Sequence, residues 1–85
     1  MTNKVVIYSK STCPFCVKAK ALLEQEGLAF EEIELNEFPQ RRDEMIEKSG
    51  GRTTVPQVFI NDKHIGGCDD LFAYHQQHGT LVVAE

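Results

Sequence analysis

The sequence predicts one mixed α/β domain in which three helices flank a four-stranded sheet, in the order β-α-β-α-β-β-α. The chain has 85 residues, enough for a single domain spanning residues 1–85. Short runs of β-branched residues alternate with longer segments of helical composition, and Gly, Pro or Asn-Asp signals separate them. A helix between the first two strands makes these strands parallel, whereas a hairpin makes the last two antiparallel. The predicted sheet is therefore mixed, with helices on its faces.

The N-terminal half is expected to form a β-α-β unit. Residues 4–8 are rich in β-branched side chains and are followed by polar residues, which predicts a short buried strand. Helical composition extends over residues 14–26, with Pro14 in the first turn, where its missing N–H costs no hydrogen bond. Gly27 is a natural stop for this helix. Residues 30–35 are expected to form the second strand, although their alternation is imperfect.

The C-terminal half is expected to contain a helix, a hairpin and a last helix. The predicted ranges are 39–49 for the first helix, 55–60 and 63–65 for the strands, and about 69–78 for the last helix. Asn61-Asp62 is the turn signal of the hairpin. Asp69 or Asp70 is the expected cap of the last helix, and Gly79 is its expected end. Residues 81–84 form a short apolar tail.

Composition and charge exclude several classes of protein. Nine Lys and Arg against thirteen Asp and Glu give a formal charge of −4, which argues against the basic face of a nucleic-acid-binding protein. No apolar run approaches the roughly 20 residues of a membrane span. The first residues lack the long apolar stretch of a signal peptide, so we expect a cytoplasmic protein.

Two of the three cysteines form a C-x-x-C pair. The cysteines are Cys13, Cys16 and Cys68, and an odd number does not make a complete structural disulfide framework. In a reducing compartment, a C-x-x-C pair is either redox-active or half of a metal site. The strand–loop–helix context of Cys13-Pro14-Phe15-Cys16 favours redox chemistry.

The expected position of the pair on the helix assigns different roles to the two thiols. Cys13 precedes the first helical residue, where unpaired N–H groups and the helix dipole favour an anion, and Lys10 adds a positive charge. Because the thiolate is the nucleophile in disulfide exchange, Cys13 is the candidate attacking thiol. Cys16 lies about one turn further on, on the apolar stripe, which favours its neutral thiol. This spacing also suits a disulfide, so Cys16 is the candidate resolving thiol.

A structural zinc site is the metal-binding alternative, and it needs a second pair of ligands. The candidates for that pair are Cys68, His64, His75 and His78. His75 and His78 are three residues apart on a predicted helix, but exposed polar side chains are the more common explanation of such a pair. We therefore expect no metal site.

Three segments, in order along the chain, resemble motifs of the glutaredoxin family, a branch of the thioredoxin superfamily. They are residues 8–16 (YSKSTCPFC), 52–60 (RTTVPQVFI) and 64–71 (HIGGCDDL). The sequence is most similar to the short bacterial dithiol glutaredoxins, which implies a thioredoxin-like fold. It does not resemble thioredoxin itself, which has Trp before its first Cys, because this chain contains no Trp.

The resemblance implies a glutathione site around the two thiols. The implied binding residues are Lys10, Phe15, Arg42, Thr54, Val55, Pro56, Gly67, Cys68 and Asp69. By this resemblance the Val55–Pro56 bond would be cis, and the backbone of Val55 would meet the ligand as an added strand does. Lys10 and Arg42 would meet the glycyl carboxylate, and the N–H groups at the start of the last helix would meet the γ-glutamyl carboxylate.

By the same resemblance, the protein would reduce protein disulfides and glutathione mixed disulfides, and so contribute to cell redox homeostasis. Glutathione would be the reductant, no cofactor would be tightly bound, and the protein would act as a monomer. The alternative is a dimer that holds a [2Fe–2S] cluster with glutathione, which Pro14 and Cys16 argue against. The family more often has Tyr where this chain has Phe15, and the Gly50-Gly51 pair leaves the choice between Arg41 and Arg42 open.

Overall fold

The computed structural model of the chain describes residues 4–79 and has the element order that the sequence predicts. The elements are β1 (Val5–Ser9), α1 (Pro14–Gln25), β2 (Glu31–Glu34), the 3-10 turn η1 (Pro39–Arg41), α2 (Arg42–Lys48), β3 (Gln57–Ile60), β4 (Lys63–Gly66) and α3 (Cys68–His78). The predicted fold class is therefore confirmed. The expected apolar tail, residues 81–84, lies outside the described residues. Within residues 4–79, no helix is long and apolar enough to cross a membrane.

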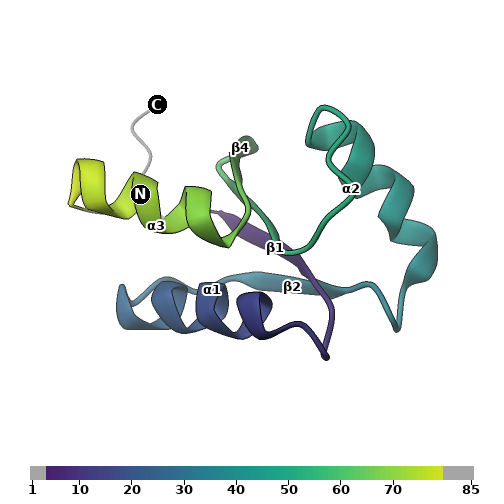
Figure 1. Cartoon of the computed structure of the whole chain (residues 1–85), viewed down its shortest axis with the longest axis horizontal. Helices are drawn as coiled ribbons and strands as arrows, with labels where there is room; N and C mark the ends of the chain where they lie inside the picture. The colour runs from purple at the N-terminus through teal and green to yellow at the C-terminus, as the bar shows by residue number, and fades with distance from the viewer. Residues whose placement is uncertain (1–3, 80–85) are drawn as a thin grey trace.

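The four strands form one mixed sheet in the order β2-β1-β3-β4 (Figure 1). β1 runs parallel to β2 and antiparallel to β3, and β3 and β4 form the predicted antiparallel hairpin. The turn of this hairpin uses Asn61 and Asp62 at φ 53° and 66°, a conformation that Asn and Asp tolerate better than most residues. The sequence signal for this turn is thus confirmed.

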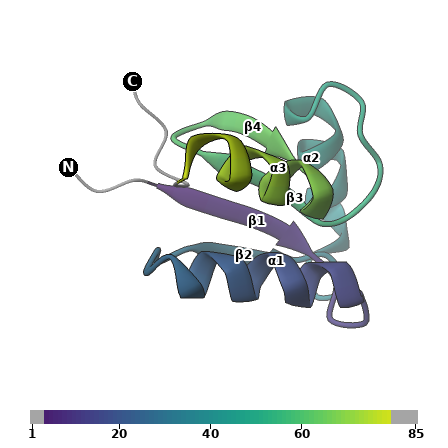
Figure 2. The ribbon, with the colours of Figure 1, turned by 60° about the vertical axis from the view of Figure 1, so that its left-hand side comes forward.

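The helices cover both faces of the sheet, with α1 and α3 on one face and α2 on the other (Figure 2). Alternation along β1 explains the two apolar layers, because Val5 and Ile7 face α1 and α3, whereas Tyr8 faces α2. The first layer consists of Val5, Ile7, Ala19, Leu22, Leu23, Val58, Ile60 and Leu71. The second layer consists of Tyr8, Ile33, Leu35, Met45 and Phe59. The first layer joins α1 and α3 to the sheet, and Cys13 and Cys68 lie at the N-terminal ends of these two helices.

β1, α1, β2 and β4 differ from their predicted ranges by at most one residue at either end, and three further differences are more substantial. The single helix expected over residues 39–49 is a 3-10 turn followed by α2, because Pro39 begins the segment with i→i+3 bonds such as Arg41 N–H to the Phe38 carbonyl. β3 begins at Gln57 rather than at residue 55, since Pro56 has no N–H to donate to the ladder. The third difference is the start of α3.

The cap of α3 is Gly67, not Asp69 or Asp70. The carboxylate of Asp70 accepts a hydrogen bond from the Gly67 N–H at 3.2 Å, so this acidic side chain caps the helix from inside its first turn. The Asp70 side chain comes so close to the backbone before Gly67 that position 66 must be glycine. Gly66 has φ +125°, and a Cβ there would lie 2.4 Å from an Asp70 carboxylate oxygen.

Candidate active site

Cys13 occupies the N-cap position of α1, as predicted. Its extended backbone (φ −93°, ψ 114°) ends the loop after β1, and Pro14 begins the helix. The Cys13 carbonyl accepts the first helical bonds, from Cys16 N–H at 3.1 Å and Val17 N–H at 3.3 Å. The first turn, residues 14–17, contains no Asp or Glu in the sequence, so no carboxylate competes for the positive end of the helix. The Cys13 side chain therefore stands at the positive end of the helix.

The two thiols have different surroundings. Cys13 is half-buried, whereas Cys16 is fully buried on the inner side of α1. Burial raises the pKa of the Cys16 thiol to about 12, although a backbone hydrogen bond from Lys10 partly opposes this rise. At neutral pH, Cys16 is therefore a neutral thiol lying directly beneath Cys13.

The loop before β3 meets the Cys13 sulfur directly. The Val55–Pro56 peptide bond is cis, as the resemblance implied. The Cys13 thiol donates a hydrogen bond to the Val55 carbonyl, with 3.7 Å between sulfur and oxygen. We did not expect this contact, because the sequence analysis assigned the Val55 carbonyl to a ligand. The structure instead shows the Cys13 thiol hydrogen-bonded to that carbonyl.

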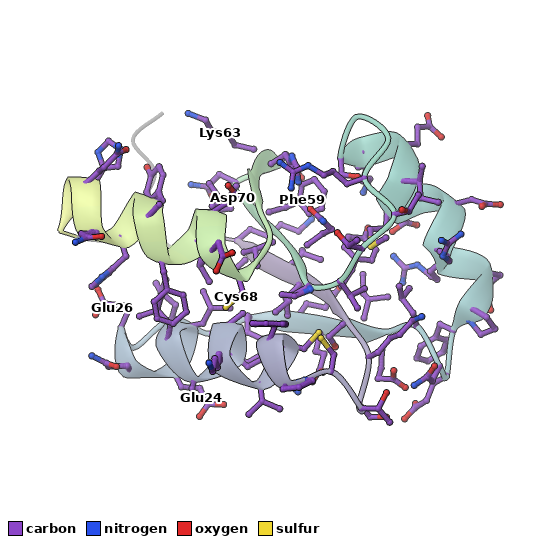
Figure 3. All side chains as sticks on the ribbon, viewed as in Figure 1. Glu24, Glu26, Phe59, Lys63, Cys68 and Asp70 are labelled. Atoms are coloured by element: carbon purple, nitrogen blue, oxygen red, sulfur yellow. The ribbon has the colours of Figure 1, made fainter. Side chains whose placement is uncertain are left out.

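A groove of about 220 Å³ opens beside this contact, between the N-terminal ends of α1 and α3 and the loop before β3. It is lined by Phe15, Arg52, Thr54, Val55, Pro56, Gly67, Cys68, Asp69 and Asp70. Figure 3 shows Cys68 between the start of α3 and α1. The structure thus brings together every implied binding residue except Lys10 and Arg42, which are not part of this lining.

Lys10 and Arg42 lie outside the groove lining. Lys10 is half-buried in the loop after β1, where its carbonyl accepts a hydrogen bond from Cys13 N–H at 3.1 Å. Arg42 is exposed at the first residue of α2. Arg41 is engaged elsewhere, since it forms an ion pair with Glu44 at 2.7 Å, and the Glu44 carboxylate also accepts a hydrogen bond from the Tyr8 hydroxyl. Of the two arginines, Arg42 is therefore the more accessible.

A larger hollow, of about 360 Å³, lies on the α2 side of the sheet. Its lining residues are Lys4, Val6, Tyr8, Glu31, Ile33, Arg41, Lys48, Phe59 and Asp62. This lining contains no cysteine, and none of its residues belongs to α1 or α3. The smaller groove, which adjoins Cys13, is therefore the candidate site.

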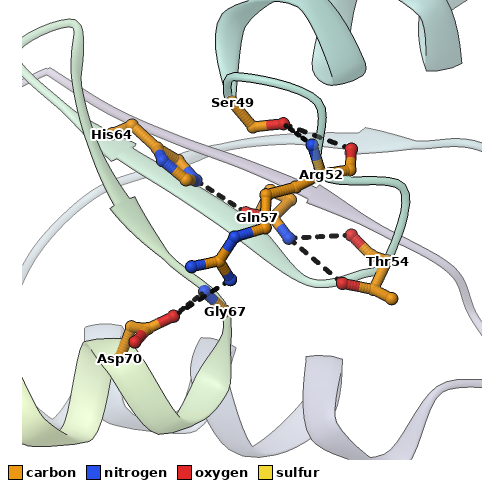
Figure 4. Close-up of polar contacts among 7 residues, drawn as sticks. All are labelled: Ser49, Arg52, Thr54, Gln57, His64, Gly67 and Asp70. Atoms are coloured by element: carbon orange, nitrogen blue, oxygen red, sulfur yellow. Dashed lines mark hydrogen bonds and ion pairs between the residues drawn. The ribbon is translucent and has the colours of Figure 1, made fainter.

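Arg52 and Asp70 line the groove but were missed by the sequence analysis. Arg52 forms an ion pair with Asp70 at 3.3 Å, and the Arg52 backbone N–H donates to the Ser49 hydroxyl at 3.1 Å (Figure 4). The sequence signal for Arg52 was its position beside the Thr53-Thr54-Val55-Pro56 motif. For Asp70, the sequence predicts only a role as the cap of the last helix.

A second missed feature is a chain of polar contacts behind the groove wall (Figure 4). Gln57 is fully buried, and its amide nitrogen donates to the Thr54 carbonyl at 3.0 Å and to the Thr54 hydroxyl at 3.3 Å. The Gln57 amide oxygen lies 2.7 Å from His64 Nε2. Burial, and then the charge of Arg52, lower the pKa of His64, so its imidazole is neutral at physiological pH.

The third cysteine and the two remaining histidines lie in different surroundings. Burial, followed by the nearby Asp69 carboxylate, raises the pKa of the Cys68 thiol. His75 is paired with Glu26 at 3.1 Å, and the His78 ring lies against Tyr74 with 4.3 Å between centroids. In the part of the chain that the structure describes, residues 4–79, no three His, Cys, Asp or Glu side chains are placed to hold a metal ion.

A C-x-x-C pair at a helix N-terminus, facing a cis-proline loop on a mixed sheet, defines a thiol–disulfide oxidoreductase with a thioredoxin-like fold. Comparison with known proteins narrows the class. The family model described as Glutaredoxin matches residues 5–65, and the chain belongs to the glutaredoxin family. Glutaredoxins are glutathione-dependent oxidoreductases, so the chain is an enzyme of this class.

Relatives and solved structures agree with this assignment. The chain is 53% identical over 75 residues to glutaredoxin 3 of Escherichia coli strain K12. The matched region covers 88% of this chain and 89% of that protein. A solution structure of glutaredoxin from Brucella melitensis is 44% identical, with a TM-score of 0.74 over 93% of this chain and 94% of that one. A crystal structure of a buckwheat glutaredoxin–glutathione complex is 36% identical, with a TM-score of 0.79 over 88% of this chain and 70% of that one.

Proposed function

We propose that the protein uses glutathione to reduce glutathione mixed disulfides and protein disulfides, with Cys13 as the attacking thiol and Cys16 as the resolving thiol. One observation carries the assignment: Cys13 lies at the helix N-terminus on the edge of a groove, whereas Cys16 is buried one turn deeper. A substrate sulfur can reach the first thiol and not the second. We further propose that the enzyme acts as a cytoplasmic monomer, without a tightly bound cofactor.

The reduction of a mixed disulfide needs only Cys13. Its thiolate attacks the glutathionyl sulfur, a Cys13–glutathione disulfide forms, and the target protein leaves as a thiolate that takes up a proton. The thiolate of a second glutathione then attacks the glutathionyl sulfur held by Cys13. Glutathione disulfide leaves, and the Cys13 thiolate is restored. Each cycle therefore consumes one glutathione, joins it to the glutathionyl group of the substrate as glutathione disulfide, and returns one target thiol.

The reduction of a protein disulfide also uses Cys16. The Cys13 thiolate attacks one substrate sulfur, and the other substrate sulfur leaves as a thiolate that takes up a proton. The resulting mixed disulfide lies one helical turn from the buried Cys16 thiol. Cys16 attacks the Cys13 sulfur as it loses its proton, and the departing substrate thiolate takes up a proton. A Cys13–Cys16 disulfide remains and is reduced by two glutathiones. The raised pKa of Cys16 keeps this thiol unreactive until a disulfide is formed above it.

The groove complements the chemistry of glutathione, a short peptide with two carboxylates and one ammonium. The Val55 backbone offers an extended edge, and Phe15, Thr54, Pro56 and Gly67 form walls. The N–H groups of Cys68 and Asp69, at the start of α3, suit the γ-glutamyl carboxylate, and the Asp69 side chain suits the ammonium. Lys10 and Arg42 remain the proposed cations for the glycyl carboxylate. The buckwheat glutaredoxin complex with glutathione supports this choice of ligand.

A coupled assay tests the proposal. Turnover of a small glutathione mixed disulfide is measured with glutathione, glutathione reductase and NADPH, for the native chain, Cys13→Ser and Cys16→Ser. We expect Cys13→Ser to be inactive and Cys16→Ser to retain much of the native activity, because only Cys13 is needed for this substrate. An inactive native protein would refute the glutathione-dependent function, and an active Cys13→Ser would refute the assignment of the thiols.

A further inference from the structure

Gln57 is a fully buried amide at the start of β3, and all of its polar atoms are directed toward two neighbours. Its nitrogen donates to both the carbonyl and the hydroxyl of Thr54, at 3.0 and 3.3 Å. Its oxygen lies 2.7 Å from Nε2 of His64, which comes from β4. A buried amide is costly unless its donors and acceptor are satisfied, and these contacts satisfy all of them.

The direction of the hydrogen bonds follows from the chemistry of Thr54. Because a carbonyl only accepts, the Gln57 nitrogen must face Thr54, and the Gln57 oxygen must face His64. The imidazole therefore carries a hydrogen on Nε2 and donates it. The His64 ring is held in this position by Phe59, with 5.0 Å between the ring centroids. The hydrogen bonds thus run in one direction, from β4 through β3 to the groove wall.

Thr54 is the residue at which these contacts reach the groove. It lines the groove and immediately precedes the cis Val55–Pro56 bond. Gln57 holds both the carbonyl and the hydroxyl oxygen of Thr54, which fixes the backbone one residue before Val55. Neither Gln57 nor His64 is among the groove-lining residues, so both act on the groove from behind.

We infer that Gln57 and His64 are positioning residues that hold Thr54, and through it the Val55 backbone edge, in the geometry that an extended glutathionyl ligand requires. This inference rests on the proposed function, because it concerns affinity for the same groove. The two residues act on ligand affinity and leave the sulfur chemistry of Cys13 unchanged. The hydrogen bond of the Cys13 sulfur goes to the Val55 carbonyl and to neither of these two side chains.

Two substitutions break this chain of hydrogen bonds, which runs from His64 through Gln57 to Thr54, at different points. Gln57→Glu keeps the size and the acceptor for His64 but removes the donors to Thr54. His64→Leu removes the donor to Gln57 at a position that is only half-buried. The matched controls are the same changes at exposed positions of α3, Gln76→Glu and His78→Leu.

Three measurements are made on each protein: the steady-state kinetics (KM and kcat) with a glutathione mixed disulfide, the affinity for S-methylglutathione, and the rate of Cys13 alkylation by iodoacetamide. We expect Gln57→Glu and His64→Leu to raise KM and weaken S-methylglutathione binding by about tenfold, a factor typical of one displaced hydrogen bond. We expect the alkylation rate to stay within about twofold of native, because iodoacetamide does not use the groove. The controls should match the native protein in all three.

The outcomes separate the inference from the proposed function. An inactive native protein refutes the proposed function. If the native protein is active and both variants keep its KM and its affinity for S-methylglutathione, the positioning role is refuted and the proposed function stands. A fall in alkylation rate that parallels the loss of affinity also refutes it, because it would show a general disturbance of the site. If Gln57→Glu does not fold, by circular dichroism, His64→Leu decides the question.

Discussion

The sulfur of Cys13 lies 3.7 Å from the carbonyl oxygen of Val55, although 42 positions separate the two residues in the chain. A thiol can donate a hydrogen to this oxygen, whereas a thiolate cannot. Ionisation of Cys13 therefore releases the Val55 carbonyl at the same time as it creates the nucleophile. In the proposed function, the backbone edge that a peptide ligand uses becomes free when the attacking group is ready.

The two active-site thiols are predicted to differ strongly in reactivity toward alkylating reagents. At pH 8, iodoacetamide should modify Cys13 in the folded, reduced protein and leave Cys16 almost unmodified. The reason is that burial raises the pKa of Cys16 to about 12, and only a thiolate reacts. Peptide mapping by mass spectrometry locates the modification. In denaturant both cysteines should react, and equal modification of both in the folded protein would contradict the structure.

The pairing of Glu44 predicts a dependence of stability on acid pH. The Arg41 guanidinium, followed by the Tyr8 hydroxyl, lowers the pKa of the Glu44 carboxyl. A carboxyl with a lowered pKa in the folded state stabilises the protein above its unfolded pKa of about 4.3, and this contribution is lost as the pH falls through the folded value. Glu44→Gln should therefore be less stable than the native protein at pH 7, and the difference should shrink at pH 3.

Urea unfolding of the native protein and Glu44→Gln at both pH values checks this prediction. The control is Glu47→Gln, the same change at an exposed position of the same helix. A difference between Glu44→Gln and the native protein that stays constant from pH 7 to pH 3 would show that the Glu44 carboxylate contributes no pH-dependent stability.

Gly66 is predicted to tolerate no side chain. Gly66→Ala should lower the free energy of unfolding by at least about 2 kcal/mol, because its positive φ and its contact with Asp70 both oppose a Cβ. Gly50→Ala is the matched control: φ is +73° there, but nothing lies within 4 Å of the added Cβ, so only about 1 kcal/mol should be lost. Urea unfolding compares the two. Equal losses would mean that the Asp70 contact contributes nothing.

The elements of this fold follow from local patterns, and for that reason the sequence predicts them well. The β-branched residues of β1, Pro14 at the start of α1 and Gly27 at its end act through their immediate neighbours. The asymmetry of Cys13 and Cys16 is also predictable, because it follows from their positions along one helix. Contacts between distant segments are different, since no local signal records that the Cys13 thiol meets the Val55 carbonyl.

The features that the sequence analysis missed depend on how elements meet. Gln57 is a polar residue at the start of the otherwise apolar β3, and that position was the available signal for a buried polar contact. Its partner His64 is identified only when the hairpin register is known. The cap of α3 was misplaced because an acidic residue is a usual cap, whereas here Gly67 takes that position and Asp70 reaches back to its N–H.

The central claim is that Cys13 carries glutathione during the reaction, and trapping this intermediate tests it most directly. Cys16→Ser is mixed with an equimolar glutathionylated peptide, quenched with acid and mapped by mass spectrometry, with Cys13→Ser treated in the same way. We predict one glutathionyl group on Cys13 of Cys16→Ser and none on Cys13→Ser. Glutathione attached at Cys68 instead, or transferred equally to Cys13→Ser, would contradict the account.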